Sequence, residues 1–379
     1  DTYNHTAYAI ETGMGVQANF TRLDTNAIQT AVKQKWLGEN YSDRCWNDKT
    51  RLLGTLNQVI PQSFIRGLNS RELAKIVQKE MNTSFYRAQR LVRTEVNHVA
   101  NQASLKMYQD SGLVDRYEYL ATLDMRTSEI CSELDGQVFD LKDAQVGVNL
   151  PPLHPHCRST TIPYFEDNEI TTRIERNDAG KSVPIPADMT YKEWENYRSS
   201  RANEPDISNT MQNIAKMTGQ KLEGFDFRLK TPSSFTRKVR TDMLEKHMSR
   251  EEVLDTMYDT VRYTLVSDPE DLVKNFKQTL YKLSEKPYNY NVRRVKNTWL
   301  DDTKAYKGIN CVFQTPSGQN FELQFHTPES FDLKQNKLHK LFEEQRQVGT
   351  TKARRAELED EMLKLSQGIT VPADIEELR

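Results

Sequence analysis

The pattern of the chain changes along its length, and this change limits the available folds more than any single motif does. Residues 1 to about 118 read mostly helical. From Tyr117 the pattern becomes short extended pieces broken by Pro and Gly, and from Ile207 to about residue 348 helical and extended segments are mixed. Changes of pattern of this kind mark the boundaries between domains. The sequence therefore predicts a two-domain α+β protein.

Two helices are predicted within residues 69–112. Ser70 is placed to cap the segment SRELAKIVQKEM, because a serine side chain can accept hydrogen bonds from the first free amides of a helix. The segment after it has apolar residues at helical spacing and a glycine stop at Gly112. The helical region is therefore expected to end just before the segment rich in Pro and Gly.

Domain boundaries follow from these changes in pattern. Residues 1–165 are predicted to form a mainly helical domain with a small, loop-rich β end, and residues 205–350 a mixed-sheet α/β domain. The polar, weakly patterned residues 166–204 are interpreted as a linker with one helix at 191–200. Residues 351–379 are expected to form a charged, largely exposed helical tail.

Composition excludes several classes of protein. The chain has 52 basic and 54 acidic residues, so its net charge of -2 argues neither for nor against nucleic acid. Its four cysteines, Cys45, Cys131, Cys157 and Cys311, are too few and too scattered for a disulfide scaffold. No apolar run approaches the roughly 20 residues of a membrane span, and no signal peptide opens the sequence. Because the first residue is Asp rather than Met, we expect a processed or truncated piece with a cytosolic location as the default.

Two thiols and two imidazoles lie close together in the sequence of the first domain. Cys131, His154, His156 and Cys157 could form a tetrahedral zinc site. Against this, no C-x-x-C pair is present, and 23 residues separate Cys131 from His154. Packed, reduced cysteines are the alternative interpretation.

The same region resembles the phage Mu F-like head-morphogenesis, or minor capsid, family. The matching motifs are LVRTE at 91–95, LDMRTSEICSELDGQVF at 123–139 and NLPPLHPHCRSTTIP at 149–163, and the resemblance covers roughly residues 25–165. It implies a structural protein of the virion or procapsid, with portal or capsid proteins as partners. Arg93, Glu95, Asp124 and Arg126 are accordingly predicted to be buried polar scaffolding rather than catalytic residues.

The second domain contains a basic run with particular spacing. In RLKTPSSFTRKVR, at 228–240, five residues are basic and none is acidic. Arg228 and Lys230 on an extended piece, followed by Ser234 and Lys238 one helical turn apart, can converge on one polyphosphate. A solvated helix face is the alternative for such a run.

Carboxylates follow this basic run at two places. Asp259 is predicted to begin a strand in DTVRYTLV, where a carboxylate can hold Mg²⁺ bridged to phosphates. Arg262 would then face the opposite side of the strand, unless the strand starts later. In the predicted hairpin 305–327, Glu322, Gln324 and His326 share one strand face.

This series resembles the synthetase domain of the RelA/SpoT alarmone family, a nucleotidyltransferase-like fold, and in particular its small toxic single-domain members. The resemblance covers about residues 223–346. Arg228, Lys230, Ser234 and Lys238 match the donor-nucleotide motif, and Asp259 matches the metal-binding aspartate. The segment 306–310 matches the Y-x-S-x-H element, and 322–327 matches E-x-Q-I-R-T.

The resemblance implies transfer of the β,γ-pyrophosphate of ATP onto a ribose 3′-hydroxyl. ATP would be held by the four residues of the donor motif and Arg262, and Mg²⁺ by Asp259 and Glu322. Glu322 would act on the acceptor hydroxyl, and the acceptor would be bound by Tyr306, Asn310, Gln324 and His326. Asn310 and His326 replace the histidine and the arginine of the family, which leaves GDP or GTP, an adenine nucleotide and tRNA open as acceptors.

Together the two resemblances predict a phage polymorphic toxin, in which a head protein is fused to a pyrophosphokinase that acts in the host bacterial cytoplasm. An immunity protein is an expected partner. The alternative is a structural minor capsid protein whose second domain is inactive or binds nucleic acid through 228–240 and the basic residues of 293–296.

Overall fold

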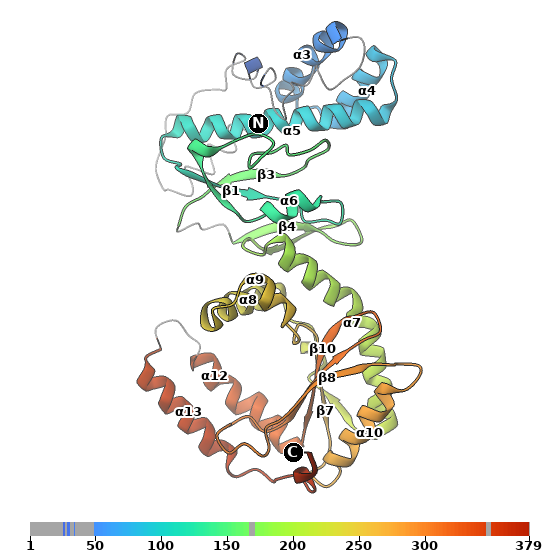
Figure 1. The fold of residues 1–379 in the computed structure, drawn as a ribbon, viewed down its shortest axis with the longest axis vertical. Helices are drawn as coiled ribbons and strands as arrows, with labels where there is room; N and C mark the ends of the chain where they lie inside the picture. Colours follow the sequence, from blue (N-terminus) through green and yellow to red (C-terminus); the bar gives the residue numbers. More distant parts are fainter. Residues whose placement is uncertain are drawn as a thin grey trace. The chain divides into compact units, whose positions relative to one another are not determined.

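The computed structural model describes residues 26, 29–30, 34, 49–166, 171–345 and 350–378. Most of the predicted helical stretch 1–48, with Cys45, lies outside these ranges. The chain divides into two compact units, Asp1–Trp194 (unit 1) and Glu195–Arg379 (unit 2). Both units combine helices with sheets (Figure 1), which confirms the mixed α+β class. Among the described residues, no helix is long and apolar enough to cross a membrane.

Unit 1 begins with three packed helices. They are α3 (Lys49–Arg66), α4 (Ser70–Met81) and α5 (Phe85–Ser111). Apolar side chains of all three, such as Leu56, Val77 and Val92, form one buried cluster. The cap of α4 is Asn69 rather than the predicted Ser70, because the Asn69 side chain accepts from two amides and the Glu72 carboxylate accepts from the Asn69 amide.

A small antiparallel sheet follows the helices. Its strand order is β2-β1-β3, with β1 at Arg116–Leu120, β2 at Val138–Asp140 and β3 at Thr160–Pro163. The short helix α6 (Glu129–Leu134) lies between β1 and β2 in the chain. The predicted loop-rich β end is therefore present.

The predicted linker, residues 166–204, is instead packed structure over its described part. β4 (Thr172–Arg176) pairs with β5 (Ser182–Pro186), and α7 runs from Tyr191 to Thr218. Arg173 explains why polar sequence was misleading here: its guanidinium donates 2.9 Å bonds to both oxygens of Asp135, which is fully buried. A polar segment can pack when its buried charges are paired, as Arg173 is with Asp135. The composition of the segment does not show such a pair.

Unit 2 is built on a five-stranded sheet of order β6-β7-β10-β9-β8. The strands are β6 (Lys221–Glu223), β7 (Arg262–Val266), β8 (Asn291–Asn297), β9 (Ile309–Gln314) and β10 (Asn320–His326). β7 and β10 are parallel, and every other pair is antiparallel. The mixed sheet predicted for this region is therefore present.

Helices cover both faces of this sheet. The core joins one face to α7 and to α10 (Leu272–Ser284) through residues such as Met211, Phe276 and Phe325. The other helices of the unit are α8 (Pro232–Lys246), α9 (Arg250–Asp255), α11 (Pro328–Asp332), a π-helix at Leu333–Leu338, α12 (His339–Gln345) and α13 (Lys352–Ser366). In Figure 1, α12 and α13 lie on the side of the sheet away from α10. The tail helix is present, and it buries Leu358 and Met362.

Candidate active site

The hairpin of β9 and β10 presents a polar face, as predicted. Along β10, Phe321, Leu323 and Phe325 belong to the buried core, so the residues between them point to the other face. There Gln324 is paired with Asn310 of β9, and Glu322 lies beside Arg262 of the parallel strand β7. This face therefore gathers a carboxylate, two amides and a guanidinium from three strands.

Asp259 lies in the turn just before β7, because that strand begins at Arg262 and not at Asp259 as predicted. The expected conflict between the two side chains therefore does not arise. The Oδ2 atom of Asp259 lies 3.1 Å from Lys230 Nζ and 3.9 Å from Lys238 Nζ. Its Oδ1 atom is buried and has no hydrogen-bond partner among the described residues.

The basic segment reaches Asp259 through Lys230 and Lys238, whereas Arg228 has a helical backbone rather than the predicted extended one. Lys230 donates its amide to Thr260 O at 3.0 Å, so the extended piece lies along the start of β7. Thr231 then caps α8, and Pro232 occupies its first turn. Ser234 and Lys238 follow one helical turn apart, and the Ser234 hydroxyl lies 3.0 Å from that of Thr231.

Arg228 is not brought to Asp259. Its Nε donates to Glu204 on α7 at 2.5 Å, and its NH1 donates to Phe225 O at 3.0 Å. Its guanidinium also lies over the Phe225 ring, 4.3 Å from the centroid. Its predicted contact with ATP stays a prediction and would require the Glu204 ion pair to open.

Charges set the protonation of the two carboxylates in opposite directions. Burial alone would raise the pKa of Asp259, but the Lys230 and Lys238 cations outweigh it and lower that pKa. Burial raises the pKa of Glu322, with Asp259 adding to the rise and Arg262 opposing it. One carboxylate is therefore held ionised while the other becomes a stronger base.

Tyr306, Asn310 and His326 form one hydrogen-bonded group. The Tyr306 hydroxyl donates to Asn310 Oδ1 and lies 2.9 Å from His326 Nε2, whereas His326 Nδ1 lies 2.9 Å from Ser330 Oγ. His326 is fully buried, and burial lowers its pKa well below the ordinary value. It thus positions Tyr306, and its predicted direct contact with the acceptor stays a prediction.

Gly308 is required by this packing. A Cβ atom there would lie 2.8 Å from His326 Cε1 and 3.0 Å from the Tyr306 hydroxyl. Any larger residue would therefore displace one of the two rings.

Lys334 is a site residue that the sequence analysis missed. It lies in the π-helix after β10, and its ammonium donates to Gln324 Oε1. Burial, with Arg262 beside it, lowers the pKa of Lys334 to about 7, while Glu322 opposes the shift. The capping signature TPES at 327–330 was the available signal, since it starts α11, which leads directly into the π-helix that carries Lys334.

The predicted magnesium ligands fit a hard cation. Mg²⁺ prefers carboxylate oxygens and is commonly held by one or two of them together with substrate phosphates. The unpartnered Oδ1 of Asp259 provides such an oxygen, and Glu322 is close enough for the two carboxylates to affect each other's charge. The donor set therefore agrees with the expectation.

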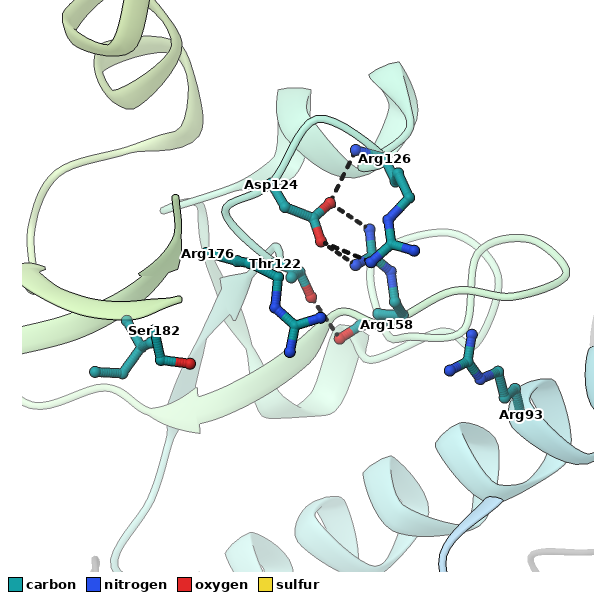
Figure 2. Close-up of a pocket in the computed structure, with 8 residues that line it drawn as sticks. Arg93, Thr122, Asp124, Arg126, Arg158, Arg176 and Ser182 are labelled. Carbon is teal, nitrogen blue, oxygen red and sulfur yellow. Dashed lines mark hydrogen bonds and ion pairs between the residues drawn. The ribbon is translucent and has the colours of Figure 1, made fainter. Parts of the chain in front are cut away.

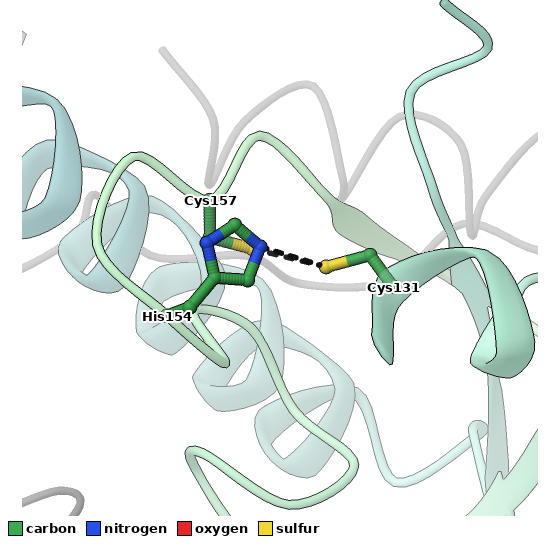
Figure 3. Close-up of side chains that lie close together, drawn as sticks. All are labelled: Cys131, His154 and Cys157. Carbon is green, nitrogen blue, oxygen red and sulfur yellow. Dashed lines mark hydrogen bonds between the residues drawn. The ribbon is translucent and has the colours of Figure 1, made fainter. Parts of the chain in front are cut away.

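Three of the four predicted zinc ligands converge in unit 1 (Figure 3). Cys131 Sγ lies 3.7 Å from Cys157 Sγ and 3.2 Å from His154 Nε2. Two sulfurs bound to one tetrahedral zinc would lie about 3.8 Å apart. His156 is not part of this group, and its ring lies 5.7 Å from that of Tyr86. Zinc stays a prediction, now with three protein ligands.

Of the four residues predicted to be buried scaffolding, the structure buries only Glu95 and Asp124. Arg93 and Arg126 are exposed, and both line a pocket that also contains Asp124 and Arg158 (Figure 2). The prediction was wrong for these arginines because a motif does not show on which side of a helix or turn a residue lies.

Comparison with known proteins identifies part of unit 1. Residues 54–162 match the family model described as "Phage Mu protein F like protein". This region is similar to the phage Mu F-like proteins. The resemblance predicted for roughly residues 25–165 is therefore confirmed over the matched range.

Two curated relatives are similar to this chain. Minor head protein GP7 of Bacillus phage SPP1 is 25% identical over 219 residues, which cover 53% of this chain and 69% of GP7. The NAD(+)--arginine ADP-ribosyltransferase EFV of Enterococcus faecalis is 23% identical over 202 residues, 49% of this chain. The match spans only 40% of that enzyme's length.

Solved structures similar to this chain include an effector, an alarmone synthetase and a GTP pyrophosphokinase family protein. The type VI effector Tas1, solved with its immunity protein, gives a TM-score of 0.31 at 16% identity and covers 45% of this chain and 92% of its own. The small alarmone synthetase 1 of Bacillus subtilis gives a TM-score of 0.33 at 15% identity, and the match covers 49% of this chain and 92% of the synthetase. A GTP pyrophosphokinase family protein of Streptococcus pneumoniae gives a TM-score of 0.34 at 12% identity, and the match covers 46% of this chain and 87% of that protein.

Proposed function

We propose that unit 2 is an ATP-dependent pyrophosphokinase that transfers the β,γ-pyrophosphate of ATP to a ribose 3′-hydroxyl. The observation that carries the proposal is the arrangement around Asp259 and Glu322. Lys230, Lys238 and Arg262 lie near the first carboxylate, while the second is partly buried and has a raised pKa. Cations that could bind a polyphosphate thus lie next to Glu322, a carboxylate that could accept a proton from a hydroxyl.

The donor nucleotide would bind at the cations. Lys230 and Lys238 both form ion pairs with Asp259. When ATP binds, its phosphate oxygens would replace Asp259 in part as the anionic partner of the two lysines. Burial lowers the pKa of Lys230, so its ammonium gains most from an anionic ligand. Mg²⁺ held at Asp259 and Glu322 would offset charge on the transferring group.

Glu322 would take the proton of the acceptor. The acceptor oxygen attacks the β-phosphorus, a new O–P bond forms, the bond to the α-phosphate oxygen breaks, and AMP leaves. A carboxylate with a raised pKa is a stronger base than a solvated one, so the transfer of the hydroxyl proton to Glu322 becomes more favourable. Gln324 is bonded to Lys334 and sits on the same strand face, so it would hold the carboxylate in place.

The acceptor would bind beside Tyr306 and Asn310. The Tyr306 hydroxyl is engaged by Asn310 and His326, which fixes the plane of the ring. An aromatic ring fixed in this way is a platform for a nucleobase. GDP or GTP, an adenine nucleotide and the 3′ end of tRNA remain the candidate acceptors.

The likeness to a phage minor head protein supports a location in the virion or procapsid, with portal or capsid proteins as partners. The likeness to an effector solved with its immunity protein motivates the same kind of partner here. We therefore infer a toxin carried with the phage head and active in the cytoplasm of a host bacterium.

The decisive experiment incubates the full chain and Mg²⁺ with γ-labelled ATP and, in separate reactions, GDP, ADP and bulk tRNA. A labelled acceptor from wild type but not from Glu322→Gln supports the proposal and names the acceptor. If no acceptor becomes labelled while Asp259→Asn and wild type bind ATP equally, the enzyme proposal fails.

Toxicity is tested separately by expressing both forms in bacteria. Growth arrest by wild type alone is expected, and equal arrest by Glu322→Gln would contradict the toxin. Any truncated form should start before Tyr191, because a cut at residue 205 would divide α7.

One observation favours a second candidate, a nucleic-acid-binding module. Arg293, Arg294 and Lys296 lie on the exposed strand β8 at the edge of the sheet. Binding to DNA or RNA that weakens steeply with salt, without labelled product, would favour this candidate.

A further inference from the structure

Four arginines from four separate segments line one pocket in unit 1 (Figure 2). Arg93 comes from α5, Arg126 from the turn after β1, Arg158 from the loop before β3 and Arg176 from the end of β4. Thr122, Asp124, Ile174 and Ser182 complete the lining. Segments this far apart in the sequence meet only because the fold brings them together.

The charges in this pocket do not balance. Asp124 is its only acidic lining residue, and Arg158 donates to both of its oxygens, with NH2 at 2.7 Å from Oδ1. That hydrogen bond lowers the pKa of Asp124, so the carboxylate is ionised at neutral pH. Arg126 lies 3.7 Å from the same carboxylate. One negative charge therefore faces four guanidinium groups.

Arg93 and Arg176 have no ion pair with any residue in the described part of the chain, and both are exposed. Their backbones are nevertheless fixed. Arg93 lies between the buried residues Val92 and Thr94, and Arg176 follows the buried Glu175 and donates its amide to Leu123 O at 3.0 Å. Two cations are thus held at the pocket on secondary-structure elements, and neither has an ion-pair partner among the described residues.

We propose that this pocket binds a phosphate group of a nucleic-acid backbone. Guanidinium forks match phosphate oxygens, and the hydroxyls of Thr122 and Ser182 add donors of the kind that contact backbone phosphates. The lining contains no aromatic ring and only one apolar side chain, Ile174, so nothing in it would recognise a base. Binding of the nucleic acid at this pocket is therefore expected to be independent of its base sequence. The site is separate from the residues proposed for catalysis, all of which lie in unit 2.

The test measures binding of a fluorescein-labelled 20-base-pair DNA duplex to the full chain by anisotropy at several salt concentrations. The variant Arg93→Ala/Arg176→Ala is compared with Arg71→Ala/Arg87→Ala, which removes the same charge from exposed helix positions of unit 1. Cations of unit 2 contribute equally to both variants. Thermal unfolding checks that both remain folded.

The pocket variant is expected to lose at least about tenfold in affinity and to reduce the salt slope by about 2, while the control variant changes little. Equal losses in the two variants, or no binding by wild type at low salt, would overturn the proposal. Competitors then separate the sources of the anion. Unlabelled duplex should displace the probe, whereas displacement only by inorganic triphosphate points to a free phosphate ligand and overturns the nucleic-acid source. Displacement by poly-L-glutamate at equal charge points to an acidic protein and overturns the phosphate chemistry.

Discussion

Asp124 in unit 1 and Asp259 in unit 2 are both carboxylates surrounded by cations, and they differ in how their oxygens are used. Both oxygens of Asp124 accept from Arg158, and Oδ1 also accepts from the Arg126 amide. Asp259 pairs through Oδ2 and leaves its buried Oδ1 without a described partner. A carboxylate whose bonds are all satisfied by the protein holds the fold together. One with an open oxygen can still bind a ligand.

The largest expected effects test the open carboxylate and its neighbour. Glu322→Gln and Asp259→Asn keep the side-chain shapes but remove the base and the anionic ligand. We expect each to lower pyrophosphate transfer by about 10²- to 10⁴-fold, measured with labelled ATP. Thermal unfolding should change little. A variant that retains wild-type turnover would show that its carboxylate is not part of the reaction.

Asp124→Asn should show the opposite behaviour. It removes the charge that Arg158 contacts in a largely buried site, which is expected to cost about 2–3 kcal/mol in the free energy of unfolding. Denaturant unfolding measures this loss, with the exposed Asp115→Asn as the matched control. Transfer activity should be unchanged, and a loss comparable to that of Asp259→Asn would break the comparison.

The cysteine and histidine cluster adds a third kind of site to unit 1, and we propose that it binds zinc. Zinc at about 100 times its Kd should stabilise the folded chain by about 2.7 kcal/mol, seen as a higher melting temperature that a chelator reverses. Cys157→Ser should abolish this shift. A shift that is equally large in Cys311→Ser and in Cys157→Ser would place the metal elsewhere.

For Lys334 the expected effect is a change in the pH dependence of stability. Its pKa in the folded chain is about 7, whereas an unfolded lysine titrates near about 10.4. Between these values the unfolded chain binds more protons, so this residue makes the free energy of unfolding rise with pH from about 7 to about 10. Lys334→Met should remove the contribution of this residue to that rise, measured as the urea midpoint of unfolding at several pH values. The exposed Lys337→Met should keep it.

Local sequence patterns allowed much of the fold to be predicted. The predictions failed where the structure of a segment depends on a contact with residues distant in the sequence. The alternation in 320–326 predicted the polar face of β10, because strand geometry alone fixes which residues share a face. The packed segment 166–204 was missed because Arg173 meets Asp135 only in the folded chain. Lys334 was missed for the same reason, since its lowered pKa depends on burial beside Arg262.

The residues near the acceptor position differ from the synthetase pattern as a set. Gly308, Asn310 and His326 are three of the departures from that pattern, and all of them contact Tyr306 or would contact it after substitution. Restoring the family's arginine at 326 or its serine at 308 alone would introduce a clash or break a hydrogen bond. Substitutions at such contacting positions are expected to be non-additive, so their effects depend on one another. At the proposed acceptor site, a change of acceptor preference is therefore expected to require replacement of these residues together, because a single replacement would disturb the packing around Tyr306.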